Sequence, residues 1–160
     1  MGNMAVIAIM NSTLDKQAAA VENFECGYNC AQSVLLAFYK EIGTDKDTAL
    51  KLASSFGGGM GRLREVCGAV CAMFIIAGII KGYTEPDNDK VKHKHYALIQ
   101  DLANEFKSKF GTIICRELLG EVGADNSPEP SKRTKEYYQT RPCSKFIKYA
   151  AKIIVEKITP

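Results

Sequence analysis

The chain has 160 residues, of which 46% are hydrophobic and 24% charged, and its net charge is +3. This length and composition favour one globular domain with its own core and exclude a disordered chain. The charge is too small, and the lysines are too evenly spread, for a nucleic-acid-binding surface.

The first residues form an apolar segment that we expect to lie outside the folded domain. Residues 1–12 contain the run MAVIAIM, which is too short to span a membrane and lacks the basic residues that open a secretory signal. We therefore predict an extension that docks on a partner subunit of a homodimer, and a cytoplasmic, reducing location. In such a location six cysteines bind metal, carry out redox chemistry or fill a core more often than they form a structural disulfide framework.

Helical periodicity dominates the remaining chain, which we expect to form one domain over residues 13–160. Capping residues and glycines at the breaks predict helices over 13–25, 30–42, 45–56, 64–80, 87–110, 113–119 and 142–157. Turn formers and mixed charge predict a long loop over residues 121–141. Because no segment alternates with a period of two, the sequence predicts an all-α, single-domain helical bundle of about six to seven helices.

Four cysteines fall at or near the predicted N-terminal ends of four different helices: Cys30, Cys67, Cys115 and Cys143. A helix N-terminus carries unpaired N–H groups and about half a positive charge, which stabilise a thiolate. Arginines flank three of these cysteines in the sequence and would lower the thiol pKa further: Arg62, Arg64, Arg116 and Arg141. The pattern indicates thiolates for redox chemistry or metal binding, with Cys67 as the attacking thiol, although cysteines that only fill a core remain an alternative.

Five further residues are secondary candidates. Gly58, Gly59 and Arg62 belong to the segment FGGGMGR, which would allow close backbone approach to a thiolate's partner and matches no phosphate-binding motif. Cys71 lies four residues after Cys67, so it would share a helix face with it and bind the same ligand, pair with Cys67 or fill the core. Cys26, at the end of the first predicted helix, is either a resolving thiol or a surface residue.

Four separate blocks of the chain resemble one bacterial family. They are GYNCAQSVL (27–35), GGGMGR with CGAVCA (57–62 and 67–72), ICRELLG (114–120) and PCSKFIKYAAKII (142–154). These blocks are similar to the C_GCAxxG_C_C family, whose members are described as redox-active and related to a domain of split-Soret cytochrome c. The resemblance places the family's four characteristic cysteines on the four helix-start positions named above.

The resemblance also implies a small cytoplasmic protein that is encoded near transporters and has an unidentified redox partner. Two features of this chain depart from what the resemblance implies. Ala72 stands where the family's CGAxxG motif ends in glycine. The sequence CxxCH is absent, so we expect no covalent c-type haem.

Three functions follow from these observations, and the sequence leaves all three open. In the first, two or more of Cys30, Cys67, Cys115 and Cys143 cycle between dithiol and disulfide or transfer electrons. In the second, the same four residues bind zinc or an iron–sulfur cluster. The third is a helical interaction domain whose cysteines only pack. Neither the substrate nor whether the protein is an enzyme can be read from the residues.

Overall fold

The computed structural model describes residues 2–160. The helices follow one another as α1 (Gly2–Glu25), α2 (Cys30–Ala37), α3 (Lys46–Ser54), α4 (Gly57–Met60), α5 (Gly68–Lys81), α6 (Asp89–Phe110), α7 (Cys115–Leu119), α8 (Lys135–Thr140) and α9 (Cys143–Lys157), with a 3-10 turn η1 (Gly120–Gly123) after α7. Within residues 2–160 there is no strand, and the extended backbone forms an isolated bridge between Val66 and Ile114. The predicted all-α, single-domain fold is confirmed.

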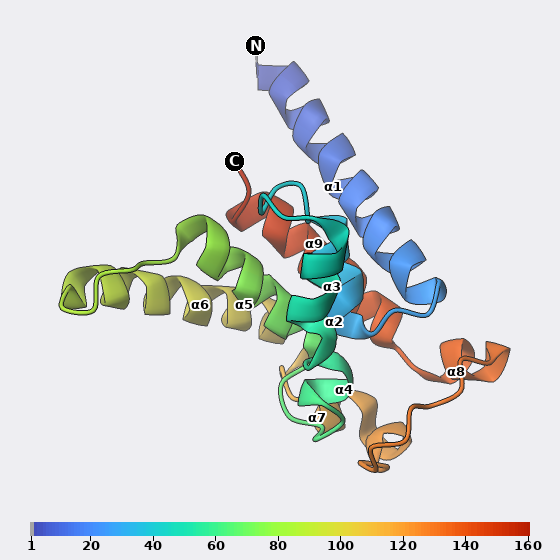
Figure 1. The fold of residues 1–160 in the computed structure, drawn as a ribbon. Coiled ribbons are helices and arrows are strands. Elements are labelled where there is room, and N and C mark those ends of the chain that lie inside the picture. Colours follow the sequence, from blue (N-terminus) through green and yellow to red (C-terminus); the bar gives the residue numbers. More distant parts are fainter. Residues whose placement is uncertain (1) are drawn as a thin grey trace.

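Helix α1 is longer than the sequence suggested. We expected the first helix to begin at Thr13, after an extension, but α1 begins at Gly2. No glycine or proline interrupts residues 3–26, so the helix continues through the apolar segment. This half of α1 projects beyond the other helices (Figure 1), and side chains such as Met4 and Met10 are 77% and 59% exposed.

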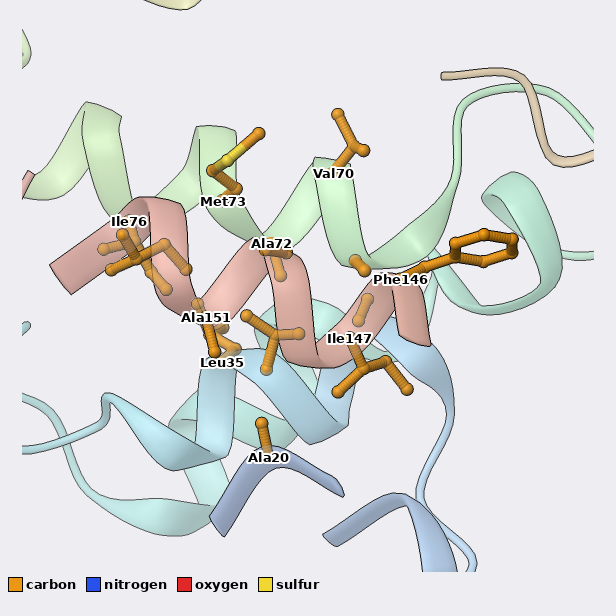
Figure 2. Packing of buried hydrophobic residues seen from close by; sticks show 14 of the residues in the cluster. Ala20, Leu35, Val70, Ala72, Met73, Ile76, Phe146, Ile147 and Ala151 are labelled. Atoms are coloured by element: carbon orange, nitrogen blue, oxygen red, sulfur yellow. The ribbon is translucent and has the colours of Figure 1, made fainter. Parts of the chain in front are cut away.

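The core lies between the second half of α1 and helices α2, α5 and α9, which contact one another. Figure 2 shows Ala72 of α5 and Ala151 of α9 at the centre of this packing, close to Leu35 of α2. Helix α5 is apolar on most sides and central, as its composition predicts. Burial of large side chains such as Ile147 and Ile76, each fully inaccessible, contributes about 1.5–3 kcal/mol apiece.

Local capping fixes the starts of several helices as predicted. The Asn29 side chain accepts a hydrogen bond from the Gln32 N–H, and the Gln32 side chain accepts one from the Asn29 N–H, so a capping box begins α2. Asp45 accepts from the Thr48 N–H at the start of α3. Gly111, with a φ of 83°, ends α6. These caps place Cys30 at the first residue of α2.

Three further predicted boundaries were wrong. Helix α2 ends at Ala37 and not at residue 42, with Phe38 as its C-cap residue. Helix α5 begins at Gly68 and not at residue 64, because φ is positive at residues 58–62 and 64 and residue 66 pairs with the segment before α7. The segment 121–141 is not a continuous loop, since it includes α8, where Thr134 accepts a hydrogen bond from the Tyr137 N–H. None of the helices in residues 2–160 has the combined length and hydropathy that a bilayer span requires.

Candidate functional site

Four cysteines from four helix starts line one small cavity. Cys30, Cys115 and Cys143 are the first residues of α2, α7 and α9, and Cys67 is the N-cap residue of α5. The cavity between them has a volume of about 10 Å³. The structure therefore brings together the four residues that the sequence singled out, and we call them the thiol cluster.

A short pairing of extended backbone places Cys67 next to Cys115. The residues that precede the two cysteines, Val66 and Ile114, form an antiparallel bridge. The Cys115 N–H donates to the carbonyl of Glu65 at 2.6 Å. Helices α5 and α7 therefore both begin directly after the bridge between Val66 and Ile114, which fixes their N-terminal ends relative to each other.

Two glycines allow the backbone to pack directly against cysteines of the cluster. A Cβ atom on Gly59 would lie 2.5 Å from the Cβ of Cys115, and one on Gly68 would lie 3.2 Å from the Cβ of Cys30. Gly59 also has a φ of 73°, which residues with a Cβ rarely adopt. The glycine-rich segment thus packs at Gly59 against Cys115 itself, whereas the approach expected from the sequence was to a partner of the thiolate. Gly68 was not singled out from the sequence, although it directly follows Cys67 in the CGA motif.

The glycine-rich segment follows a left-handed path that few sequences tolerate. The φ angle is positive at every residue from 58 to 62 and again at Arg64. Gly58 adopts this conformation without strain, but Met60, Arg62 and Arg64 carry side chains, and their φ angles of 66°, 66° and 61° are uncommon. Such strain persists only where surrounding contacts hold it.

The two arginines of this segment hold the following loop in place. Arg62 donates to the Asp125 carboxylate at 2.7 Å and to the Ser127 carbonyl at 2.5 Å. Arg64 is only 3% exposed and donates from Nε and Nη2 to the Asp125 carbonyl at 2.9 and 2.7 Å. These bonds fasten residues 125–131 against the glycine-rich segment, next to the thiol cluster.

A larger pocket of about 320 Å³ lies beside the cluster and shares Cys30, Cys115 and Cys143 with it. Its lining also includes four arginines from separate segments: Arg62, Arg64, Arg133 and Arg141. No local pattern singles out Arg133, because it lies in a polar stretch of mixed charge. Only the fold brings it near Cys30.

The thiols of the cluster do not ionise alike. A hydrogen bond from the Cys143 side chain lowers the pKa of Cys30 to about 7 in spite of burial, and the positive charge of Arg133 acts in the same direction. The same hydrogen bond, together with burial, raises the pKa of Cys143 far above its ordinary value. Cys30 and Cys143 therefore behave as a pair in which Cys143 keeps its proton and Cys30 becomes the thiolate.

Cys67 is not the low-pKa thiol that its flanking arginines suggested. It is 4% exposed, and burial, followed by the charge of the Cys30 thiolate, raises its pKa. Arg62 and Arg64 donate to the loop instead. Burial also raises the pKa of Cys115, against a hydrogen bond from Arg64.

The two remaining cysteines lie outside the cluster cavity. Cys71 is buried inside α5, where its thiol donates to the Val66 carbonyl at 3.7 Å and burial raises its pKa to about 11. Cys26 is exposed just after α1. All six cysteines are free thiols in this structure.

The four-cysteine arrangement agrees with a family match over most of the chain. Residues 28–157 match the family model described as "Putative redox-active protein (C_GCAxxG_C_C)". The chain belongs to the C_GCAxxG_C_C family. The matched region runs from just before Cys30 to the end of α9, so it contains the whole thiol cluster. Comparison with curated proteins and with solved structures found no match.

The four thiols of this C_GCAxxG_C_C protein are also candidate metal ligands. Four thiolates suit zinc or an iron–sulfur cluster in chemical type, and zinc would require each sulfur to lie about 2.3 Å from a common point. Across residues 2–160, however, no three His, Cys, Asp or Glu side chains are arranged to hold a metal ion. The geometry of the cluster therefore does not support a preformed metal site.

Proposed function

We propose that the protein is a thiol–disulfide redox protein of a reducing, cytoplasmic environment, in which Cys30 is the attacking thiolate and Cys143 the resolving thiol. The observation that carries the proposal is the placement of Cys30 and Cys143 at the first residues of α2 and α9, where both line the small cavity and the larger pocket. The interaction of the two side chains there lowers the pKa of Cys30 to about 7 and raises that of Cys143. A thiol with a pKa near the ambient pH combines a large thiolate fraction with strong nucleophilicity.

The reaction is two successive exchanges. The Cys30 thiolate attacks one sulfur of a substrate disulfide, and half of the substrate leaves as a thiolate that takes up a proton. Cys143 then loses its proton and attacks the Cys30 sulfur, which releases the second half of the substrate. Two electrons pass from the cysteines to the substrate, and a Cys30–Cys143 disulfide remains. An external dithiol, the unidentified redox partner, reduces that disulfide again.

Access to the cluster supports the same assignment of roles. Cys30 is half-buried and lines both the inner cavity and the 320 Å³ pocket, so a substrate in the pocket can reach it. Cys143 also lines both spaces. Cys67 lines the inner cavity without lining the larger pocket, which suits a structural position better than a first encounter with substrate.

Alkylation with iodoacetamide tests the role of Cys30. At pH 6.5 we expect Cys30 to react faster than a free-thiol control, with the modified position identified by peptide mass mapping. The rate should fall as the pH falls below about 7, because the Cys30 thiolate is then protonated. In Cys143→Ala the stabilising hydrogen bond is lost, so the rate at pH 6.5 should drop roughly tenfold. Cys26→Ala, which removes an exposed thiol outside the cluster, is the matched control.

Oxidation tests the pairing. After treatment with the neutral reagent 2-hydroxyethyl disulfide, peptide mapping should find Cys30 linked to Cys143. The proposal is wrong if no cysteine outpaces the free-thiol control at pH 6.5, or if the first link formed excludes Cys30.

Metal binding, the other chemistry that four thiols allow, has a separate signature. Anaerobically purified protein would then contain stoichiometric zinc or iron, and a thiolate–iron centre would absorb near ~400 nm. Stoichiometric metal bound through Cys30 would replace the redox proposal.

A further inference from the structure

The pocket beside the thiol cluster has an unusual charge. It is lined by four arginines, and no aspartate or glutamate of residues 2–160 is among its lining residues. The charge of Arg62 is offset by the Asp125 carboxylate at 2.7 Å. Arg133 and Arg141, by contrast, form no salt bridge within the described chain. Arg64 has no carboxylate partner either, but its donors are used on the Asp125 carbonyl. Arg133 and Arg141 are thus the two lining arginines that have neither an ion pair nor a pair of short hydrogen bonds.

Arg133 also has an unused donor. Its Nη1 is buried and has no hydrogen-bond partner among residues 2–160, while its Nη2 donates to the Tyr28 carbonyl at 3.2 Å. The guanidinium lies 4.7 Å from the centroid of the Phe24 ring and 4.6 Å from that of Tyr137, so the rings hold it in position. A buried cationic N–H without an acceptor costs free energy, and an acceptor on a bound ligand would remove that cost.

Tyr137 supports both unpaired arginines. The Arg141 guanidinium lies 4.8 Å from the same ring centroid, and its hydrogen bonds to Val122 and Ser131 are long, at 3.4 and 3.5 Å. The positive charges of two guanidinium groups on one aromatic ring repel each other, and an anion bound between them would offset this repulsion. Their planar N–H forks match the geometry of a carboxylate or another oxyanion. The two side chains thus form a preformed anion site.

The pocket connects this anion site to the reactive sulfur. Cys30 lines the same pocket, and the positive charge of Arg133 helps to lower the pKa of the Cys30 thiol. A volume of about 320 Å³ suits a small molecule, since small-molecule sites begin at about 300 Å³. Arg62 and Arg64 hold the Ser127 and Asp125 carbonyls, and the residues that follow, Pro128 and Pro130, line the pocket.

We propose that the substrate is a small disulfide that carries a carboxylate, which binds to Arg133 and Arg141 while Cys30 attacks the disulfide bond. This inference rests on the redox function proposed above and adds the class of substrate. The bonds made and broken are those of the two exchanges already described: the carboxylate-bearing disulfide gains two electrons and two protons and leaves as two thiols, and Cys30 and Cys143 become a disulfide.

The first test compares two alkylating reagents that differ by one carboxylate. Iodoacetate and iodoacetamide react with the same sulfur, and each rate at Cys30 is divided by its rate with free cysteine. We expect the normalised ratio to favour iodoacetate by about tenfold, the effect of one charge-assisted hydrogen bond. In Arg133→Met and Arg141→Met the preference should disappear. The ratio is insensitive to the Cys30 pKa, because any change in thiolate fraction affects both reagents equally.

Lys132→Met is the matched control, because it removes one positive charge from an exposed position of the same loop that does not line the pocket. This variant should keep the full preference for iodoacetate. Arg133→Lys, which retains the charge but loses the planar fork, should keep only part of it. If Lys132→Met and Arg133→Met lose the preference for iodoacetate equally, the preference comes from net charge alone and the proposed site is wrong.

The second test uses disulfides of similar size and different charge: 3,3′-dithiodipropionate, 2-hydroxyethyl disulfide and cystamine. Cys30 should be oxidised fastest by the first, which carries two carboxylates, and slowest by cystamine, which carries two ammonium groups. Competition by inorganic phosphate without any preference for dithiodipropionate would identify a free oxyanion site and overturn the substrate assignment. Fast reaction of Cys30 with iodoacetamide but no preference for iodoacetate would overturn this inference alone, whereas slow reaction with both reagents would overturn the redox function itself.

Discussion

Cys30 and Cys143 show how strongly one residue's chemistry depends on its immediate neighbours. Both are the first residue of a helix, so both receive the same electrostatic help from unpaired N–H groups. Their pKa values nevertheless move in opposite directions, because Cys143 donates its proton to the hydrogen bond and Cys30 accepts it. Position at a helix start therefore selects candidate thiols, and the contact between side chains decides which one ionises.

Gly59 combines a close backbone approach with a positive φ, so substitution there should be damaging. An added Cβ would lie 2.5 Å from the Cys115 Cβ and 2.9 Å from the Arg64 Cα, and the φ of 73° is itself unfavourable for alanine. We expect Gly59→Ala to lower the free energy of unfolding by about 2–4 kcal/mol, measured by urea denaturation. Gly78→Ala is the control: an added Cβ there meets nothing within 4 Å, and inside helix α5 it should stabilise by about 0.5–1 kcal/mol. Equal effects of the two substitutions would contradict the packing argument.

Among the structural elements, the loop of residues 125–131, which follows η1, depends on arginine contacts for its order. Arg64 is buried and gives the Asp125 carbonyl two hydrogen bonds, whereas the Arg62–Asp125 ion pair involves a carboxylate that is 63% exposed and is therefore strongly screened by solvent. Arg64→Met should therefore release residues 125–131, seen as faster amide hydrogen exchange and faster proteolysis there. Asp125→Asn removes the ion pair but keeps the carbonyl, so it should have a much smaller effect. Comparable release in both variants would show that the ion pair, and not the buried arginine, holds the loop.

Helix starts that depend on local capping could be predicted from the sequence, and those that depend on distant contacts could not. Asn29 and Asp45 cap α2 and α3 through neighbours three residues away, so their signals are contained in short sequences. The start of α5 was misplaced because residue 66 pairs with residue 114, which no local pattern reveals. Helix α8 was missed because its start, Thr134, is embedded in a polar, turn-rich stretch.

The same distinction applies to the candidate site. The four cysteines could be selected from local signals, since each lies at a helix start. The order of their pKa values could not, because it depends on burial and on the contact of Cys30 with Cys143. The position of Arg133 beside Cys30 likewise requires the tertiary fold.

For the molecule as a whole, the buried thiols make stability depend on alkaline pH. Folding raises the pKa of Cys67, Cys115 and Cys143, so above the ordinary thiol pKa of ~8.5 the folded chain binds more protons than the unfolded chain. Their contribution is fully present below that pH and is lost as the pH rises. Cys30, whose pKa is lowered, contributes in the opposite sense, and its contribution is lost as the pH falls through about 7.

We therefore expect the free energy of unfolding, measured with urea under reducing conditions, to fall between pH 8.5 and 10 by about 1 kcal/mol per pH unit for each protonated buried thiol. Lysines and tyrosines also titrate in this range, so the informative quantity is the difference between variants. In Cys67→Ala the free energy of unfolding should fall less steeply with pH than in the native chain, because one fewer thiol keeps its proton only in the folded state. Identical slopes would mean that Cys67 ionises as easily in the folded state as in the unfolded one.

The thiol cluster is assembled from residues 30, 67, 115 and 143, which span most of the chain. During synthesis Cys143 is the last of these to emerge, and until α9 docks, Cys30 lacks the largest of the interactions that lower its pKa. A nascent or misfolded copy therefore carries thiols of ordinary acidity and reacts slowly with oxidants near neutral pH. Under the redox function proposed above, the full reactivity of Cys30 therefore requires the last helix to be in place, which would protect the growing chain from premature cross-linking.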